Sequence, residues 1–393
     1  MDFALSAEGA LLADGLGRFL ESRYDLTQSR IAAKTGVGWQ PEIWREMVTD
    51  LGIIGACLPG EIGGDGGGPE ELMVVTEALG HALVIEPFVE SVVLGAGLLA
   101  RIDHPRAKDV AAQVADGGAI IATAALESTS GGVLDRITTT ATRAADGWVV
   151  TGAKEVVTTA PIADHLIVTA RLIDGEVGAS GAHDRDDFGL FVIPLGAERA
   201  DGLEMHEFRT LDDRRAADLV FTDVRLPADA LISSGETALA ALEGAWDDAT
   251  AAVISEAVGV MRKVVADTVA YATARQQFGR PLAGFQALSH RLVDMYIELE
   301  QAVAAQYLAI LGRDGDAVQR AASVSAAKAT ISRAARFIGQ NAVQLHGGMG
   351  LTEELAIGHY FRRLTVIEYE FGSADYHLAR FERISRADGA VAG

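Results

Sequence analysis

Two short segments in the last third of the chain carry residue types suited to binding a nucleotide. Residues 274–281 read ARQQFGRP, in which Arg275 supplies a permanently charged guanidinium fork for phosphate oxygens and Phe278 adds an aromatic surface. Residues 344–350 read QLHGGMG, and adjacent glycines let backbone amides come close to a diphosphate. Because the two segments occur together, a nucleotide site is favoured over an isolated surface arginine.

The histidines and the cysteine do not form any other catalytic or metal-binding pattern. His81, His165, His346 and His359 are scattered without ligand spacing, and we interpret each as structural, although His346 lies inside the second segment. The single cysteine, Cys57, excludes an intramolecular disulfide and suits a reducing compartment. We therefore expect no metal site and no hydrolase-type triad.

The composition indicates a large folded protein with a strongly acidic balance. The chain has 393 residues, 49% of them hydrophobic, and 55 acidic against 33 basic residues give a formal charge of −22. This charge opposes binding to nucleic acid phosphates and to anionic lipid. The most apolar stretch, residues 72–100, is interrupted by charged side chains, and the amino terminus lacks a signal-peptide pattern. We expect a cytoplasmic protein without a membrane span.

The elements that must position the two segments fall into three parts, which makes the fold class α+β. Helical spacing of apolar residues predicts an N-terminal helical domain at 1–117, and long periodic segments predict a C-terminal bundle of long helices at 233–393. Between them, residues 118–232 carry short β-rich runs separated by turns, which predicts an antiparallel β-barrel or sandwich. The expected strands are Ala119–Leu126, Ile137–Ala144, Trp148–Thr159, Leu166–Leu172, Phe188–Leu195 and Asp218–Arg225.

Three segments together resemble signatures of the acyl-CoA dehydrogenase family. They are the two segments above and FTDVRLP at residues 221–227, and the resemblance extends from Leu51 to about Arg383. Their order and spacing within an α-β-α plan are jointly specific. The resemblance implies FAD-dependent α,β-desaturation of an acyl-CoA thioester in a tetramer whose FAD lies at a subunit interface. It also implies an electron-transfer flavoprotein as the electron acceptor.

The same resemblance divides the FAD site between two chains. It assigns Arg275, Phe278, Gln344, Gly347 and Gly348 to the adenosine and pyrophosphate end of a neighbouring chain's FAD. The flavin ring would lie against the chain's own β domain and last helices. In the family, a glutamate removes the α-proton of the acyl-CoA while hydride leaves the β-carbon for flavin N5.

Several residues that would contact this chain's own flavin differ from the family pattern. The family's loop Thr-Glu-Pro-Gly-Ala-Gly-Ser-Asp aligns with residues 126–133, LESTSGGV, where Leu126 and Gly132 replace two hydroxyl-bearing residues. Each lost polar contact is worth roughly 0.5–1.5 kcal/mol, so both losses weaken FAD binding by about one or two orders of magnitude. The family's Trp-Ile-Thr beside the flavin is Val-Val-Thr here, so the aromatic wall is lost while the hydroxyl of Thr158 survives near N5.

The catalytic base is the largest departure from the family pattern. The family often carries Tyr-Glu-Gly-Thr, and an ungapped alignment places Phe371 at the glutamate position. A one-residue insertion would make Glu370 the base, which must lie in a desolvated pocket with a raised pKa. Some relatives place the glutamate on an early helix of the bundle, at Ala249 here, just after Asp247 and Asp248. The alternative for these two is a solvated acidic helix start.

The residues for a neighbour's FAD match the family pattern, whereas those for the chain's own flavin and base do not. This difference predicts a subunit of an α2β2 heterotetramer that completes the FAD site of a homologous partner. Paired dehydrogenases of this kind resemble the chain and act in actinobacterial steroid side-chain oxidation, so a steroid side-chain CoA ester is a family-level expectation. Two alternatives keep the same fold: a self-sufficient homotetrameric dehydrogenase that uses Glu370, and a non-catalytic interaction protein. A hydratase or an oxygenase that uses this fold is a further alternative.

Overall fold

The computed structural model describes residues 5–173, 185–196 and 200–391, and it divides into two compact units. The first unit contains Met1–Ile31, Gly68–Ile85 and Thr250–Gly393, and the second contains Ala32–Gly67 and Glu86–Ala249. The three-domain division with boundaries near residues 117 and 232 remains a prediction. The α+β class with helical, β and helical regions in this order is confirmed.

The first unit is helical. Its N-terminal helices α1 (Ala7–Arg23) and α5 (Pro69–Ala82) pack against each other, and the Ser6 hydroxyl caps α1 by accepting a hydrogen bond from the Gly9 amide at 2.9 Å. The short α2 (Leu26–Lys34) begins in the first unit and ends in the second. The long helices are α8 (Gly235–Ala274, which begins in the second unit), α9 (Gln286–Gly312), α10 (Ala317–His346), α11 (Ile357–Tyr369) and α12 (Ala374–Val391).

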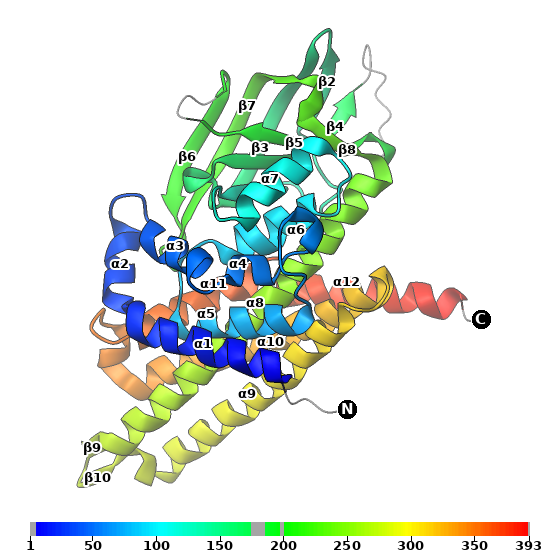
Figure 1. The fold of residues 1–393 in the computed structure, drawn as a ribbon. Helices are drawn as coiled ribbons and strands as arrows, with labels where there is room; N and C mark the ends of the chain where they lie inside the picture. Colours follow the sequence, from blue (N-terminus) through cyan, green and yellow to red (C-terminus); the bar gives the residue numbers. More distant parts are fainter. Residues whose placement is uncertain (1–4, 174–184, 197–199, 392–393) are drawn as a thin grey trace. The chain divides into compact units, whose positions relative to one another are not determined.

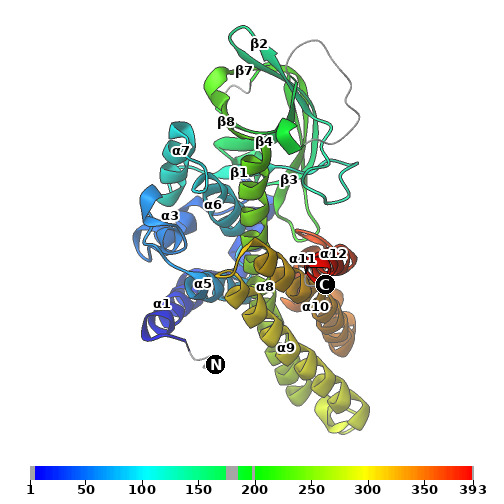
Figure 2. The same ribbon diagram turned by 90° about the vertical axis from the view of Figure 1, so that its right-hand side faces the viewer.

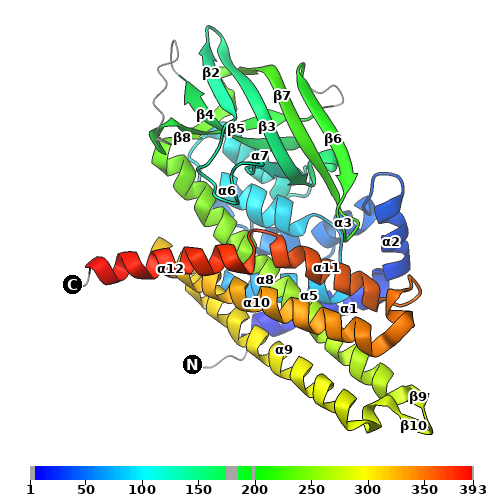
Figure 3. The ribbon, with the colours of Figure 1, turned by 180° about the vertical axis from the view of Figure 1, so that it is seen from behind.

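Helix α10 is the centre of the long-helix bundle. It packs against α9, α11 and α12, as Figures 2 and 3 show. Most of the periodic apolar positions that predicted the bundle are buried, among them Met295 on α9 and Ile331 and Ile338 on α10. The predicted bundle of long helices is therefore confirmed.

Two glycines let α5 and α8 cross with their backbones in contact. A Cβ atom on Gly80 would lie 2.1 Å from the carbonyl oxygen of Glu256, and one on Gly259 would lie 1.9 Å from the carbonyl oxygen of Glu77. Neither position can accept a larger residue without moving a backbone. This crossing fixes Glu77 and Glu256 inside the first unit.

The second unit is built on an eight-stranded sheet with the order β6-β7-β3-β2-β4-β5-β8, in which β1 also pairs with β4. Figure 3 shows β3, β7 and β6 side by side. Strand β4 is parallel to both β1 and β2, so the sheet is mixed and not wholly antiparallel as expected. The strands are β1 (Ile121–Ala124), β2 (Thr140–Ala144), β3 (Gly147–Thr158), β4 (His165–Ile173), β5 (Phe188–Pro194), β6 (Leu203–Arg209), β7 (Arg215–Pro227) and β8 (Leu231–Ser234).

The remaining elements of the second unit are short helices. Strand β1 and α7 (Pro105–Ala115) both contact a fully buried π-helix, Phe88–Ala96. The other helices are α3 (Pro41–Thr49), α4 (Ile53–Ala56) and α6 (Gly97–Leu99), with 3₁₀ turns at Gly60–Ile62, Ala160–Ile162, Arg185–Asp187 and Ala228–Ala230. Among the residues that the structure describes, no helix combines the length and apolar character needed to cross a membrane.

Two strands of the eight-stranded sheet, β6 and β8, were not predicted from the sequence. Strand β6, LEMHEFR, buries only Leu203 because it lies at the edge of the sheet, so it lacks an apolar run. Strand β8 is only four residues long. Helix α8 ends at Ala274, and Phe278 and Gly279 then form the turn of a hairpin between β9 (Gln276–Gln277) and β10 (Arg280–Pro281).

Candidate functional site

The β9–β10 hairpin presents an aromatic side chain that this chain itself does not cover. Phe278 is 93% exposed and has a φ angle of 52°, a left-handed conformation that is costly for a bulky residue. Gly279 follows with a φ of 77°, which glycine adopts without strain. Figure 1 shows the hairpin at the tip of the α8–α9 pair. An exposed and strained phenylalanine indicates a contact with something outside the chain.

Arg275 lies at the base of this hairpin, and its guanidinium group is exposed to solvent. Its backbone is fixed, because its amide donates to the Tyr271 carbonyl at 2.8 Å and its carbonyl accepts from the Leu282 amide at 2.9 Å. Its exposed guanidinium has no hydrogen-bond or ion-pair partner within the described part of the chain. The second arginine of the hairpin, Arg280, instead lies over the Phe285 ring at 4.0 Å. Arg275 is therefore placed to bind an anion.

The Gln-x-x-Gly-Gly segment forms the exposed C-terminal end of α10. Gly347 caps the helix with a φ of 61°, as glycine commonly does. Gly348 needs no left-handed φ, and a Cβ atom there would meet nothing within 4 Å. Nothing within this chain therefore requires a glycine at position 348, which fits close approach by a ligand. Gln344, Gly347 and Gly348 are all exposed.

An aromatic stack joins the two segments within the first unit. The His346 ring stacks on the Tyr271 ring with centroids 4.3 Å apart, and His346 Nδ1 lies 2.9 Å from the Ala342 carbonyl oxygen. Tyr271 lies in the last turn of α8, four residues before Arg275. The structural interpretation of His346 therefore fits this packing, which brings the ends of α8 and α10 together.

The loop that would face this chain's own flavin has its polar groups satisfied internally. The buried Glu127 carboxylate accepts from the Thr138 amide and hydroxyl, both at 2.6 Å, from the Thr139 amide at 3.1 Å and from Lys154 Nζ at 2.7 Å. Burial by itself would raise the pKa of Glu127, but Lys154 and Thr138 outweigh it and lower this pKa to about 2. The Ser130 hydroxyl donates to the Glu127 carbonyl at 2.8 Å.

The strand segment expected beside the flavin keeps an unusual backbone. Val156 has a φ of 51°, and the pairing of β3 with β7 shifts register between Lys154 and Val157. The Val156 amide donates to Asp218 Oδ1 at 2.8 Å, which holds this bulge in place. Thr158 is half-buried at the end of β3. Val156 itself offers no aromatic ring to a flavin.

The two halves of the expected FAD site therefore differ in their fit to the cofactor. The residues expected to bind a neighbour's FAD are exposed and lie on one unit: Arg275, Phe278, Gln344, Gly347 and Gly348. On the chain's own side Leu126 lacks a hydroxyl, and the loop carboxylate and hydroxyl are engaged by the protein. The outward half fits the adenosine diphosphate end of FAD, whereas the loop around Leu126 does not fit a flavin ring.

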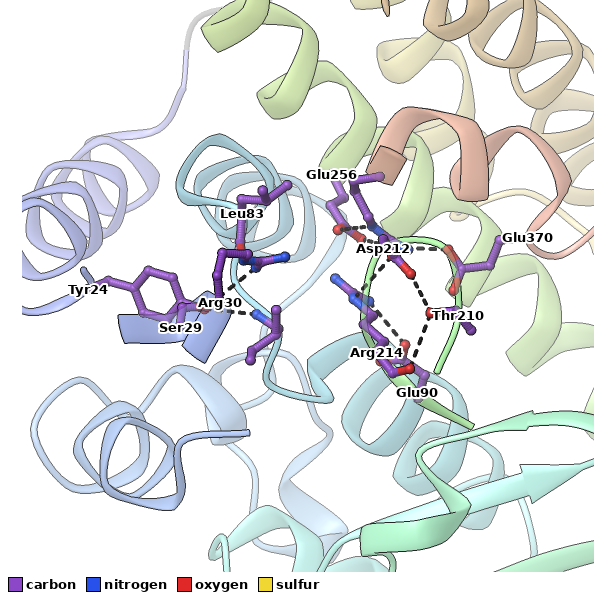
Figure 4. A network of polar contacts seen from close by, with 12 residues as sticks. Tyr24, Ser29, Arg30, Leu83, Glu90, Thr210, Asp212, Arg214, Glu256 and Glu370 are labelled. Carbon is purple, nitrogen blue, oxygen red and sulfur yellow. Dashed lines mark hydrogen bonds and ion pairs between the residues drawn. The ribbon is translucent and has the colours of Figure 1, made fainter. Parts of the chain in front are cut away.

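The candidate base Glu370 takes part in an ion-pair network. Arg363 donates to both oxygens of Glu256 at 2.6 Å and lies 2.9 Å from Glu370 Oε2. Arg363 is fully buried, and the Glu370 side chain is only 11% exposed. Figure 4 labels Glu256 and Glu370. Glu370 is therefore already paired with a buried cation, and proton abstraction by Glu370 would have to disturb this ion pair.

Two buried basic side chains, Lys328 and His377, also fix the backbone around Glu370. Lys328 Nζ donates to the Gly372 carbonyl at 2.8 Å, and His377 Nε2 lies 3.1 Å from the Phe371 carbonyl. Burial lowers the pKa of Lys328 to about 7. Burial, followed by the nearby Lys328 and Arg380, lowers the pKa of His377 to about 3. The sequence analysis missed this network, although Lys328 stands one turn after Val324 in the apolar pattern of α10.

The other acidic candidates are not a solvated helix start. Asp247 and Asp248 are 2% and 6% exposed, and Asp248 forms an ion pair with Arg101 in the second unit. The predicted alternative of a solvated acidic helix start is therefore wrong, because both residues are buried. Ala249, the family position, is fully buried and carries no carboxylate.

A further buried pair links the π-helix to the β6–β7 turn. Arg214 donates to Glu90 Oε1 at 3.1 Å, and its Nε lies 3.7 Å from Asp212 Oδ2, as Figure 4 shows for the labelled residues. Glu90, Asp212 and the Arg214 side chain are all at least 89% buried. The sequence analysis did not identify these residues. The short sequence separation of Asp212 and Arg214 was the one available signal for an ion pair here.

Comparisons with known proteins agree with the three signature segments. The acyl-CoA dehydrogenase N-terminal, middle and C-terminal domain families match residues 6–101, 122–224 and 241–385. The acyl-CoA dehydrogenase FadE12 of Mycobacterium tuberculosis is 30% identical over 80% of each chain.

Two solved structures with this fold cover nearly the whole chain. The ChsE4-ChsE5 complex from Mycobacterium tuberculosis matches at 25% identity over 98% of each chain, with a TM-score of 0.85. The Tcur3481-Tcur3483 steroid ACAD matches at 28% identity over 98% of this chain and 99% of that chain, with a TM-score of 0.84. The chain belongs to the acyl-CoA dehydrogenase family, whose members are FAD-dependent oxidoreductases that act on CH–CH bonds.

Proposed function

We propose that this chain is the subunit of a heteromeric acyl-CoA dehydrogenase that completes the FAD site of a homologous partner. The exposure of Phe278 carries this proposal, because 93% of this strained side chain is uncovered in the single chain. Arg275 beside it offers an unpaired guanidinium to a diphosphate. Both would contact FAD held mainly by the partner, and Gln344, Gly347 and Gly348 would line the same end of the cofactor.

The chemistry itself belongs to the partner in this proposal. FAD, when bound, supplies the hydride acceptor for α,β-desaturation of an acyl-CoA thioester. In this chain Glu370 is held by Arg363, which already neutralises Glu256, so proton abstraction by Glu370 would have to break a buried ion pair. Its role here is to anchor the α11–α12 connection. Thr158 alone does not replace the missing flavin contacts.

The partner and substrate classes follow from the chain's relatives. Two similar structures pair different chains, one described as the ChsE4-ChsE5 complex and the other as a steroid ACAD. A heterotetramer of two such chains with two homologous catalytic chains, acting on a steroid side-chain CoA ester, is therefore part of the proposal. An electron-transfer flavoprotein as acceptor and a cytoplasmic location complete it.

Measuring the FAD content tests whether this chain binds FAD only together with a homologous partner. The chain produced alone is expected to retain little FAD, whereas co-production with a homologue that carries the family glutamate restores FAD to the assembly. Arg275→Ala should lower FAD retention of the assembly at least tenfold, since a charge-assisted contact is worth about 1.5–3 kcal/mol. Arg18→Ala, which removes an exposed arginine on α1, is the matched control and should retain FAD.

The alternative is a self-sufficient homotetramer with Glu370 as base. Full flavin occupancy and turnover of the chain made alone would establish it and overturn the heteromeric proposal. Glu370→Gln separates the two in the assembly, since turnover should stay within about twofold of wild type if the partner supplies the base. A loss of three or more orders of magnitude would assign the chemistry to this chain.

A further inference from the structure

A cavity of about 680 Å³ lies within the first unit, where helices α1, α5 and α8 meet residues Tyr307 and Tyr360. Its volume falls in the range of roughly 300–1,000 Å³ that is typical of small-molecule sites. None of the residues expected to bind FAD or to act as base lines it. The cavity therefore needs an explanation of its own.

The body of the cavity is apolar, and a glycine keeps it open. Leu20 of α1 and Met73, Val74 and Ala78 of α5 contribute aliphatic walls. Gly17 also lines the cavity, and a Cβ atom built on it would meet nothing within 4 Å. The space beside Gly17 is therefore large enough for atoms of a ligand, and an apolar ligand would gain burial there.

The charged groups along the cavity are already engaged with one another. Glu77 accepts from Arg262 and from Gln306, both at 2.8 Å, and Lys263 pairs with Asp267 at 2.6 Å. Glu21 adds a further negative charge to the lining. A carboxylate or phosphate ligand would meet a net negative lining and find no uncompensated cation, so an anion is disfavoured.

The hydroxyl groups of Tyr24 and Tyr360 are also engaged in hydrogen bonds, and His81 is a further polar side chain in the lining. The Tyr24 hydroxyl lies 2.7 Å from Ser29 Oγ and accepts from the Ile85 amide at 3.0 Å, and the Tyr360 hydroxyl donates to the His81 carbonyl at 2.8 Å. Figure 4 shows Tyr24 beside Ser29. The His81 imidazole has no hydrogen-bond partner within the described ranges.

The protonation of His81 decides what it can recognise. Burial, and then the nearby Lys263, lowers the pKa of His81, so the ring is neutral at pH 7. A neutral imidazole offers one N–H donor and one acceptor nitrogen. It can therefore bind a hydroxyl or a carbonyl group without supplying a charge.

We infer that this cavity is a binding site for an uncharged, mainly apolar small molecule that carries a hydroxyl or carbonyl group, with His81 as its polar contact. The site is separate from the FAD-binding residues and does not depend on the function proposed above. It makes this chain a receptor for a second ligand in addition to its contribution to a shared cofactor site.

Binding of the neutral fluorophore N-phenyl-1-naphthylamine to the assembled protein tests the inference. Saturable fluorescence enhancement is expected in wild type, and Gly17→Phe should weaken it at least tenfold by filling the cavity. Gly15→Phe, on the same helix with open space at its Cβ position but outside the cavity, is the matched control and should bind as wild type does. Ala13→Phe, one turn before Gly17, is a second filling variant if Gly17→Phe does not fold.

Competition identifies the class of ligand. At pH 8, 1-decanol should displace the fluorophore while decanoate at the same concentration should not. His81→Leu should raise the 1-decanol concentration needed by about two- to tenfold, the worth of one hydrogen bond. Unchanged fluorophore binding in both filling variants, or the absence of saturable binding, overturns the site. Equal displacement by decanoate overturns the neutral ligand class. Both readouts are independent of flavin content and turnover, so they fail separately from the proposed function.

Discussion

Two residues of this chain, Gly348 and Phe278, have features that its own packing does not require. Gly348 has neither a left-handed φ nor a neighbour that excludes a Cβ atom, and Phe278 is both exposed and strained. Packing within the chain explains neither residue. Both are explained if a bound nucleotide approaches the backbone at Gly348 and stacks against Phe278.

Gly348→Ala should therefore lower FAD retention without lowering stability. One methyl group at a close backbone contact is expected to weaken FAD binding by about tenfold, while the denaturant midpoint stays unchanged. Gly60→Ala, at another glycine with open space and no left-handed φ, is the matched control. Equal flavin content in the two variants would remove Gly348 from the cofactor site.

His377 should make the chain sensitive to mild acid. Its pKa in the folded chain is about 3, below the ordinary value of 6.5, so folding favours the neutral ring. Unfolding then takes up a proton below pH 6.5, and the free energy of unfolding falls as the pH drops from 6.5 toward 3. At pH 5 the loss is about 2 kcal/mol relative to pH 7.5.

His377→Gln, which keeps a donor for the Phe371 carbonyl but does not titrate, should lack this part of the pH dependence. Urea unfolding of both proteins at pH 7.5 and pH 5.0 measures it. Parallel losses of stability in the two proteins would show that His377 is not buried in its neutral form.

At the scale of elements, periodic apolar patterns predicted the long helices and the apolar strands. They did not predict a polar strand that forms only by pairing with its neighbour. Helices α9 and α10 have clear helical periods, and β2 and β3 coincide with two of the expected strands and are joined by a turn at Ala145–Asp146. The polar strand β6 is stabilised by pairing with β7, and the sequence of β6 alone does not predict this pairing.

The candidate site divides in the same way. Local motifs pointed to Arg275, Phe278 and the glycines at the end of α10, because each motif is continuous in sequence. The contacts of Arg363 with Glu256 and of Lys154 with Glu127 join distant segments, and a single sequence does not reveal such contacts. The parallel pairing of β4 with β1 and β2 is long-range in the same sense.

The Glu127–Lys154 pair should govern the stability of the sheet. Lys154→Met leaves the Glu127 carboxylate buried without its cation, which is expected to cost about 3–5 kcal/mol of unfolding free energy. The double variant Lys154→Met with Glu127→Gln should recover most of this loss, because it removes the uncompensated charge. Denaturant unfolding of the single and double variants measures both effects, and a double variant no more stable than Lys154→Met would contradict the assignment.

At the scale of the whole molecule, the bundle leaves an apolar stripe without cover in the single chain. Val293, Ile297, Leu308 and Leu311 of α9 are each 46–54% exposed. Residues at this spacing share one helical face, and an exposed apolar face of this length is typical of a subunit interface. With a formal charge of −22, the chain would otherwise be expected to stay monomeric through self-repulsion.

Leu308→Glu should therefore weaken the assembly without unfolding the chain, because it places a charge on this stripe. Light scattering after size exclusion is expected to show a smaller particle, and flavin should be lost with it, since Arg275 and Phe278 then no longer reach the partner's FAD. Gln301→Glu, an exposed polar position on the same helix, is the control and should leave mass and flavin unchanged. If Leu308→Glu keeps the wild-type mass, the stripe is not the interface. If the mass falls while flavin per partner chain stays constant, the partner binds FAD by itself and this chain's nucleotide-binding end has another use.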